Sequence, residues 1–444
     1  MSEELLKRVR EDGVKFICLQ FTDVTGGVKS VDIPASKLES VIGDGIFFDG
    51  SSIEGFARIQ ESDMMLVPDG ETYAVLPWSQ EERKRARIFC DVYTPSGTMF
   101  RGSPRNVLKM YLEKLDKKGW KYFVGSEPEF FLIKKNGPDS IHPVPYDIGG
   151  YFDFSARDDA QRVRAELMGA LTKMGLEIEM GHHEVALGQH EIDFQFADAL
   201  RTADNVVTMK YTVKALAVEA GLTATFMPKP IHGINGSGMH CHQSIADMEG
   251  NNLFFDANDE FHLSSMAYHF MAGQLHHARA LAAVVAPTVN SYKRIVPGYE
   301  APVYICWAQM NRSAMIRIPH AGVDKPMATR AELRFPDPSS NPYLAFTAML
   351  AAGMDGIEKK MECPPPVNNI NIFEMNDAEL DELGIGQLPD SLGAALDEFE
   401  KDEVLKNALG PETVEAFLRA KRSEWENFTT HVTDWEVRQY LETA

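Results

Sequence analysis

The chain has 444 residues, more than one ordinary domain holds, so we expect at least two structural units and a large core. Hydrophobic residues make up 44% of the chain and charged residues 25%, the proportions of a soluble globular protein. The formal net charge of −21 argues against nucleic acid as a partner, because phosphate binding needs a basic surface. The longest apolar run, 280–287, is far too short to span a membrane, so we expect no membrane partner either.

The N-terminal residues and the cysteines bear on the compartment. Residues 1–8 carry charges where a signal peptide would need an apolar segment. The cysteines are scattered and form no CxxC pair: Cys18, Cys90, Cys241, Cys306 and Cys363. This pattern fits a reducing environment, and we expect a cytoplasmic protein.

The first hundred residues have the pattern of a small β unit. The apolar, β-branched runs 14–20 and 28–33 flank a glycine-containing turn and predict a hairpin. Short strand-like runs follow at 64–67, 73–76 and 87–93. Ser103 and Pro104 then predict a helix start, with Ser103 as the N-cap. We therefore place a domain boundary at 102/103, which divides the chain into 1–102 and 103–444.

Helical and strand-like patterns alternate in the second part of the chain. We expect helices at 157–174, 204–220, 264–285 and 341–361, and a nearly continuous helical pattern from 391 to 444. Because the intervening strands are short, the fold class is α+β, with an antiparallel sheet flanked by helices. The sequence contains no internal repeat.

Charged side chains interrupt several apolar, strand-like runs. In 122–133, Glu127 and Glu129 are two residues apart and therefore share one face of a strand. The run 185–196 follows Glu184 and places polar side chains on one face: Gln189, Glu191, Asp193 and Gln195. Two further runs do the same, 237–244 with His240, His242 and Ser244, and 330–335 with Arg330, Glu332 and Arg334.

Each of these runs, taken singly, also fits an amphipathic strand with a solvated face. Their aromatic neighbours imply partial burial, and clustered buried carboxylates repel one another unless cations neutralise them. Five glutamates and one histidine form a hard, oxygen-rich ligand set that suits Mg²⁺ or Mn²⁺ better than structural zinc. Periodicity leaves open whether the strands are neighbours in space.

Arginines form a second cluster in the sequence: Arg294, Arg312, Arg317, Arg330 and Arg334. Guanidinium groups bind phosphates and carboxylates in a bidentate manner, although surface ion pairs would account for each arginine singly. Metal-held carboxylates beside arginines are what phosphoryl transfer needs. Neither a GxxxxGK[ST] nor a GxGxxG motif occurs, so the sequence gives no support to a P-loop or Rossmann fold.

Several blocks, in this order, resemble the successive signatures of type I glutamine synthetases. They are 48–56 (FDGSSIEGF), Glu127-Pro-Glu129, 235–240 (NGSGMH), 296–302 (VPGYEAP), 311–313 (NRS) and 334–338 (RFPDP). The match covers essentially the whole chain. It implies an ATP-dependent ligation of ammonia to L-glutamate through a γ-glutamyl phosphate, with L-glutamine, ADP and phosphate as products in nitrogen assimilation.

The resemblance also implies a role for individual residues. The cation nearer glutamate and ammonia would be held by Glu129, Glu184 and Glu191. The cation nearer the ATP phosphates would be held by Glu127, His240 and Glu332. The nucleotide side would include Phe196, His242, Ser244, Arg312, Arg317 and Arg330. The glutamate side would include Asn235, Gly236, Arg294, Glu300 and Arg334. The catalytic residues would be Asp49, Glu300 and Arg312, with Asp49 deprotonating ammonium, Glu300 on a flap that closes the site and Arg312 stabilising charge on the phosphoryl group.

The family fold pairs a small β-grasp N-terminal domain with a large catalytic domain. Its members form homo-oligomers, and for this chain we expect a dodecamer of two stacked six-membered rings with active sites between neighbours. Two or more Mg²⁺ or Mn²⁺ ions per subunit would be the cofactors. The partners would be L-glutamate, ammonium and ATP, with regulatory proteins in addition.

Two departures from the family pattern indicate the alpha subtype. The adenylylated subtype carries a tyrosine where this chain has Phe373, and the connection between Arg317 and Arg330 is short. Arg58 matches an arginine linked to glutamine feedback inhibition in the alpha subtype, although a plain surface arginine would explain it too. A family lysine near the nucleotide is displaced, since Met327 occupies the aligned position and Lys325 lies two residues earlier.

Two rival functions remain. A related ligase would join glutamate to an amine larger than ammonia, but both ammonium-side carboxylates, Asp49 and Glu300, are present. A structural relative without activity would have lost some of the metal ligands, and all of them match here.

Overall fold

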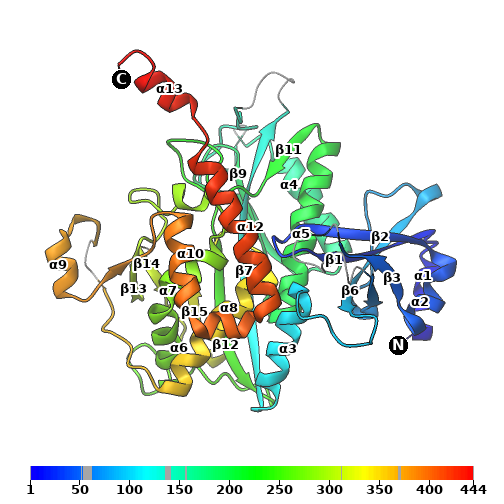
Figure 1. The fold of residues 1–444 in the computed structure, drawn as a ribbon, viewed down its shortest axis with the longest axis horizontal. Helices are drawn as coiled ribbons and strands as arrows, with labels where there is room; N and C mark the ends of the chain where they lie inside the picture. Colours follow the sequence, from blue (N-terminus) through cyan, green and yellow to red (C-terminus); the bar gives the residue numbers. More distant parts are fainter. Residues whose placement is uncertain are drawn as a thin grey trace.

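The structure is a computed structural model that describes residues 2–51, 53, 63–135, 142–155, 158–311, 313–368 and 372–443. It shows a small N-terminal unit beside a large unit in which helices pack against a long sheet (Figure 1). The α+β fold class is confirmed. None of the helices in these ranges is long and apolar enough to cross a membrane. Arg58 and Arg312 lie outside the described residues.

The small unit is built on a mixed sheet whose strand order is β2-β1-β6-β4-β3, with β5 paired to β6. Its strands are β1 (Phe16–Thr22), β2 (Val28–Pro34), β3 (Ile46–Asp49), β4 (Asp63–Pro68), β5 (Ala74–Val75) and β6 (Arg85–Tyr93). The predicted β1–β2 hairpin is present, and the Asp23 carboxylate closes its turn by accepting from the backbone N–H of Thr25 and Gly27. β1 and β6 pair in parallel.

Two helices of the small unit, α1 (Ser2–Glu11) and α2 (Leu38–Asp44), were not predicted. The spacing of Leu5 and Val9 places both on one face of α1, where they enter the core of this unit. Strand β1 is buried on both faces of the small sheet. Ile17 and Leu19 belong to the core of the small unit, whereas Cys18, between them, packs into the core of the large unit.

The large sheet has the order β16-β13-β14-β15-β12-β7-β9-β8, with β10 and β11 also paired to β7. Its strands are β7 (Trp120–Lys134), β8 (Ile178–His183), β9 (Gln189–Phe194), β10 (Ala197–Asp198), β11 (Leu222–Thr225), β12 (Met239–Asp247), β13 (Tyr304–Ala308), β14 (Ala314–Arg317), β15 (Ala331–Leu333) and β16 (Gly386–Gln387). The pairing is antiparallel as predicted, except that β13 and β14 run parallel.

The helices of the large unit are α3 (Pro104–Asp116), α4 (Gln161–Lys173), α5 (Ala199–Glu219), α6 (Ser265–His276), α7 (Ala278–Val285), α8 (Pro342–Lys359), α9 (Asp377–Glu382), α10 (Leu392–Lys401), α11 (Glu403–Leu409), α12 (Pro411–Thr429) and α13 (Asp434–Tyr440). Three predictions need correction. The run 264–285 is two helices that meet at His277, and the run from 391 is divided into α10 to α13. Ser103 precedes α3 as predicted, but its side chain accepts no capping hydrogen bond.

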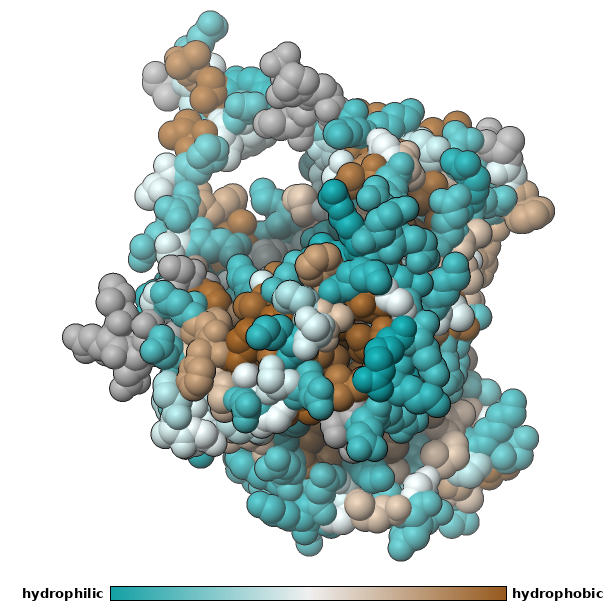
Figure 2. Space-filling view, turned by 90° about the vertical axis from the view of Figure 1, so that its right-hand side faces the viewer, coloured by the Kyte–Doolittle hydropathy of each residue, from teal (hydrophilic) through white to brown (hydrophobic). Residues whose placement is uncertain are grey.

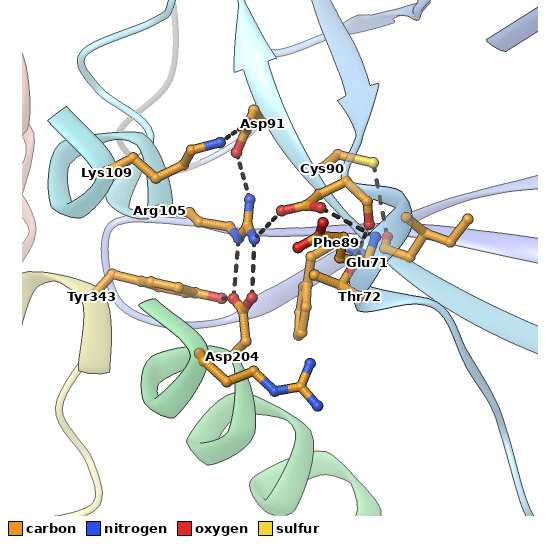
Figure 3. A network of polar contacts seen from close by, with 12 residues as sticks. Glu71, Thr72, Phe89, Cys90, Asp91, Arg105, Lys109, Asp204 and Tyr343 are labelled. Atoms are coloured by element: carbon orange, nitrogen blue, oxygen red, sulfur yellow. Dashed lines mark hydrogen bonds and ion pairs between the residues drawn. The ribbon is translucent and has the colours of Figure 1, made fainter. Parts of the chain in front are cut away.

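A buried ion-pair network joins the two units (Figure 3). Arg105 on α3 donates to Asp91 on β6 at 2.6 Å, to Asp69 at 2.7 Å and to Asp204 on α5 at 3.0 Å. Tyr343 at the start of α8 donates to the same Asp204 at 2.6 Å. Because Arg105 is almost fully buried and bonded on both sides, it holds the small sheet against the helices of the large unit.

Candidate active site

The strand order brings the predicted acidic strands together. β15, β12, β7 and β9 are consecutive in the large sheet. In their registers His240 lies opposite Glu127, Glu129 lies opposite Glu191, and His242 lies opposite Glu332. The polar faces that the sequence predicted for separate strands therefore form one continuous surface.

Glu127, His240 and Glu332 form a compact group whose candidate ligand atoms lie within 4.8 Å of one another. His240 Nδ1 is 3.6 Å from Glu127 Oε2 and 3.8 Å from Glu332 Oε1, too far for hydrogen bonds. Both oxygens of Glu332 already have cationic partners. Its Oε2 accepts from Arg317 at 2.8 Å, and Oε1, the oxygen that faces His240, accepts from Arg334 at 2.5 Å.

His242 orients Glu127 rather than adding a free ligand atom. Arg330 Nε donates to His242 Nδ1 at 3.1 Å, so Nδ1 must accept. The proton of a neutral His242 then lies on Nε2, which is 2.7 Å from Glu127 Oε1 and donates to it. An arginine on β15's flank is thereby connected through His242 to the carboxylate on β7.

A second group comprises His182, Glu184 and Glu191, again with candidate ligand atoms within 4.8 Å. His182 lies 3.7 Å from Glu184 and 3.9 Å from Glu191. Glu129, predicted for this group, lines the same cavity, but its Oε2 accepts from Gln189 at 2.6 Å and from the backbone N–H of Gly238 at 3.0 Å. Its other oxygen, Oε1, is the one without a protein donor in these contacts.

His182 was missed because the predicted strand began at 185. The preceding strand, β8, ends in His182 and His183, and alternation on this strand places His182 opposite Glu191 on the cavity face. A histidine pair immediately before Glu184 was the signal in the sequence that could have identified it. Tyr151, from the segment between β7 and α4, also lines the cavity and carried no such signal.

The two groups differ in how their charge is balanced. Burial and the nearby Glu184 raise the pKa of Glu129 to about 8, and burial together with Glu129 and Asp193 raises the pKa of Glu191. Burial acts the same way on Glu127 and Glu332, but there the neighbouring histidines and Arg334 outweigh it and lower the pKa. Arg294 and Arg334 lower the pKa of Glu129 but do not offset burial and Glu184, so the negative charge on the Glu129–Glu191 side is only partly balanced, and a bound divalent ion would complete the balance.

Two cavities meet at Glu127, which lines both. The first, about 230 Å³, is lined by every predicted metal ligand, by all the residues predicted for glutamate, and by Arg317. The second, about 280 Å³, is lined by the remaining described residues predicted for the nucleotide: Phe196, His242, Ser244 and Arg330. Phe196 is 44% exposed, so its ring is available to a planar ligand.

A loop with an unusual backbone borders the first cavity. Glu300 has a φ of 58°, in the left-handed region that residues with a side chain rarely adopt. Its Oε2 accepts from Asn235 Nδ2 at 3.1 Å, which ties the loop to the Asn235–Gly236 segment. The buried Arg294 lies nearby, and its guanidinium group donates hydrogen bonds to the backbone oxygens of Phe335 and Arg334.

The remaining predicted residues are not brought to this site. Asp49 ends β3 in the small unit, where it is exposed and accepts from the backbone N–H of Ser51 at 2.9 Å. It lines neither of the two cavities, whose described lining residues all come from beyond residue 120. Arg58 and Arg312, as well as the side chain of Phe373, fall outside what the structure describes.

Comparison with known proteins decides the family. A model of the glutamine synthetase catalytic domain matches residues 101–440, and a model of the glutamine synthetase β-grasp domain matches residues 13–95. The chain belongs to the glutamine synthetase family. Its activity is the ATP-dependent synthesis of glutamine from glutamate and ammonia, and it carries the family's β-grasp and catalytic domains.

Individual glutamine synthetases are similar over their full length. The enzyme of Methanocaldococcus jannaschii is 51% identical, with 99% of this chain and 98% of that protein covered, and that of Thermus thermophilus is 50% identical with the same coverage. Among solved structures, Plasmodium falciparum glutamine synthetase has a TM-score of 0.88 at 26% identity, covering 99% of this chain and 98% of that one. The ADP complex of GmaS has a TM-score of 0.87 at 35% identity, covering 98% and 99%.

The family uses divalent metals, and the residues present here fit them. Carboxylate oxygens dominate both groups, as hard cations require. The buried Glu129 and Glu191 also repel one another across the β7–β9 register, which a cation would relieve.

Proposed function

We propose that the two cavities form one site for two Mg²⁺ or Mn²⁺ ions, glutamate and ATP, with the residue roles implied by the family resemblance. Glu129, Glu184 and Glu191 hold one cation, with His182 in reach, and Glu127, His240 and Glu332 hold the other. What carries this proposal is that all of these side chains line a single cavity and include buried carboxylates, Glu129 and Glu191, whose charge the neighbouring cations do not fully offset. When bound, the cations neutralise charge on the transferring phosphoryl group.

The chain's own residues bind and orient the substrates. Phe196, His242 and Ser244 receive the nucleotide in the second cavity, beside Arg330, and Arg317 meets its phosphates. The ADP complex of GmaS, a structural neighbour, supports nucleotide binding by this fold. Asn235, Gly236, Arg294 and Arg334 orient glutamate for phosphorylation of its side chain, and Arg312 stabilises charge on the phosphoryl group.

Glu300 helps to exclude water from the site and accepts a proton, and Asp49 accepts a proton from ammonium. The loop that carries Glu300 closes over the first cavity and keeps water from the γ-glutamyl phosphate, and its carboxylate takes a proton. Asp49 removes a proton from ammonium, so that ammonia can attack the acyl phosphate. Its pKa is lowered by the hydrogen bond from Ser51, which keeps it ionised and able to bind a cation.

Asp49 acts on a neighbouring subunit in this proposal. It is exposed on the small unit and lines neither cavity of its own chain, so a head-to-tail ring that places it in the next subunit's site would complete the catalytic set.

We infer a dodecamer of two six-membered rings. Exposed apolar side chains support an oligomer, since they gather on the face that carries the small unit (Figure 2) and on α13, which stands away from the body (Figure 1). On and beside α13 these are Val432, Trp435, Val437, Tyr440 and Leu441.

We also propose domain boundaries, a subtype, a compartment and a mode of regulation for this enzyme. The domains are 1–102 and 103–444, and the chain is a type I enzyme of the alpha subtype in the cytoplasm. Phe373 has no hydroxyl to modify, so control falls to glutamine, through Arg58, and to regulatory proteins.

Phosphate release tests the substrate, and mixing two inactive variants tests the shared site. Glutamate with ammonium is expected to drive phosphate release, whereas equal release with glutamate and a polyamine would contradict the proposal.

Asp49→Ala and Glu332→Ala chains are each expected to be nearly inactive. Assembled together at equal ratio, about a quarter of the sites would pair two intact partners by random mixing in a ring, and activity should return. No return in a confirmed mixed oligomer would place Asp49 outside the neighbour's site.

A further inference from the structure

A third charged group lies behind the cation site and lines neither cavity. It consists of five buried residues: Asp147, Asp158, Arg164 on α4, His183 at the end of β8 and His190 on β9. We call it the buried relay. Candidate ligand atoms of its two aspartates and two histidines lie within 4.8 Å of one another, so by distance alone it resembles a metal site.

Hydrogen bonds occupy three of the four histidine nitrogens of the buried relay, and the fourth faces a carboxylate. Arg164 lies 3.0 Å from His190 Nδ1, and because a guanidinium only donates, Nδ1 must accept. The proton of a neutral His190 is then on Nε2, which faces Asp147 Oδ2 at 3.2 Å in a close contact that lacks hydrogen-bond geometry.

His183 is hydrogen-bonded at both ring nitrogens. Its Nδ1 lies 2.6 Å from the carbonyl oxygen of Glu184, which can only accept, so Nδ1 carries a proton. Its Nε2 lies 2.7 Å from Asp147 Oδ1, a separation that requires a proton between the two atoms. Arg164 donates in addition to both oxygens of Asp158, at 2.6 and 3.3 Å. The group is closed and needs no metal to balance it.

The buried relay holds the strands that carry the cation ligands. His183 and His190 are partners in the β8–β9 register, and the next pair in that register is His182 and Glu191, whose side chains point to the opposite face of the sheet. Asp147 contacts both relay histidines and also accepts from the backbone N–H of Gly188 in the β8–β9 turn at 3.0 Å. Fixing one pair from behind therefore fixes the other in front.

The same contacts place the loop that carries Tyr151. The backbone oxygen of His183 accepts from Phe152 N at 3.0 Å, and Phe152 meets the ring of His182 edge-on at 4.7 Å. Gly149 passes so close that an added Cβ would lie 2.7 Å from the ring of His183. Any shift of His183 would thus move both His182 and a loop residue that lines the cavity.

We propose that Asp147 is a positioning residue for the cation site formed by Glu184 and Glu191. It sets the separation of these carboxylates by fixing His183, His190 and the β8–β9 turn from the opposite face of the sheet. This inference rests on the proposed metal ligands. Partners of this kind, which orient ligands without touching the ion, change metal affinity by about 10- to 100-fold when removed.

Manganese binding to the metal-free, assembled protein, followed by electron paramagnetic resonance, tests the proposal. Asp147→Asn should weaken one of two manganese sites by about 10- to 100-fold and leave the other within about twofold, because Glu127, His240 and Glu332 lie on other strands. Asp204→Asn is the matched control. It removes a charge from the Arg105 network on α5, a helix that contributes no lining residue to either cavity, and should leave both sites unchanged.

A second variant keeps the test independent of the folding of the first. Gly149→Ala removes no charge but drives a methyl group against His183, and it should weaken the same site. Unchanged affinity in folded Asp147→Asn and Gly149→Ala, or an equal loss in Asp204→Asn, overturns the positioning role. So does a third metal ion that wild type retains and Asp147→Asn loses.

Glu191→Gln separates this failure from failure of the proposed function. If Glu191→Gln loses a manganese site while Asp147→Asn behaves like wild type, only the positioning role is wrong. If Glu191→Gln and wild type bind manganese equally, the ligand assignment is wrong and the positioning role fails with it.

Discussion

The junction between the two units and the cavity of the large sheet both bury several carboxylates, but they balance them differently. At the junction, Asp69, Asp91 and Asp204 surround Arg105, and Lys109 adds a second cation on Asp91 (Figure 3). In the cavity, Glu332 has Arg317 and Arg334 as partners, whereas Glu129 and Glu191 face each other without a base between them. We call the charge at the junction closed, because each of its carboxylates is paired with a cation. We call the charge in the cavity open, because Glu129 and Glu191 face each other without such a pair.

This difference separates structural charge from functional charge. Buried ions that are fully paired hold elements together, because removal of one partner leaves the other uncompensated. Carboxylates held close together without partners destabilise the fold and persist where a ligand neutralises them. In our proposal the open cluster is the place where cations and phosphates bind, and the closed ones, including the buried relay, position the chain around it.

Glu332→Gln should have the largest effect. The amide keeps one acceptor oxygen, which can serve only one of Arg317 and Arg334, and it loses the charge that a cation needs, so we expect turnover to fall by about a hundredfold or more. Steady-state phosphate release in Mg²⁺ measures it. Glu219→Gln, on the exposed end of α5, is the control and should have no effect. Wild-type turnover for Glu332→Gln would remove Glu332 from the metal ligands.

Asp204→Asn should mainly lower stability. Its amide would face the buried Arg105 and lose one of two bonds to it, which we expect to cost about 3 kcal/mol. The midpoint of thermal unfolding at fixed chain concentration measures the change. Asp397→Asn breaks an exposed ion pair with Arg422 and should cost less than about 1 kcal/mol. Similar shifts for both variants would mean that the junction is no stronger than a surface pair.

Divalent cations should stabilise the protein more as the pH rises. The pKa of Glu129 is raised from 4.5 to about 8, so the metal-free folded state holds a proton that the unfolded state releases. Metal-free stability therefore falls between about pH 4.5 and about pH 8, and a cation that displaces the proton restores it. The rise in melting temperature with Mn²⁺ should be larger at about pH 8 than at about pH 6. Equal rises would indicate a cation site elsewhere.

Substitution of His277 should have the smallest of these effects. This residue belongs to a third cluster of paired buried charges. It bridges Asp355 at 3.0 Å and Asp402 at 2.6 Å, and these bonds outweigh burial and raise its pKa. The stabilisation is complete below the pKa of the unfolded state and is lost as the pH rises through the higher folded value. His277→Gln should cost about 1–3 kcal/mol in mildly acid solution and less in alkaline solution. A cost that grows with pH would contradict a charged His277.

The sequence predicted the site better than its surroundings. Glu127, Glu129, Glu191 and Glu332 could be assigned to one face of their strands because side chains alternate with a period of two. Their convergence could not be predicted, since it depends on β15, β12, β7 and β9 being neighbours, which are non-local pairings. The family resemblance supplied the roles that alternation alone left open.

Residues whose role depends on tertiary contacts escaped prediction. His182 acquires a place in the site because His183 and His190 are fixed behind it, and Asp147 carries no local pattern that distinguishes it from a loop aspartate. His277 lies where α6 and α7 meet and contacts two aspartates that are distant in the sequence. In each case the decisive partner is remote in sequence, so a periodicity window does not include it.

Anomalous scattering at the manganese edge, from crystals of the assembled protein grown with Mn²⁺, tests the central claim most directly. We predict one peak among Glu127, His240 and Glu332 and a second bounded by Glu184 and Glu191, with Glu129 or His182 beside it. Neither the buried relay nor the Arg105 network should hold an ion. A peak between Asp147 and the relay histidines, or a cavity without manganese, would contradict the distinction between open and closed charge.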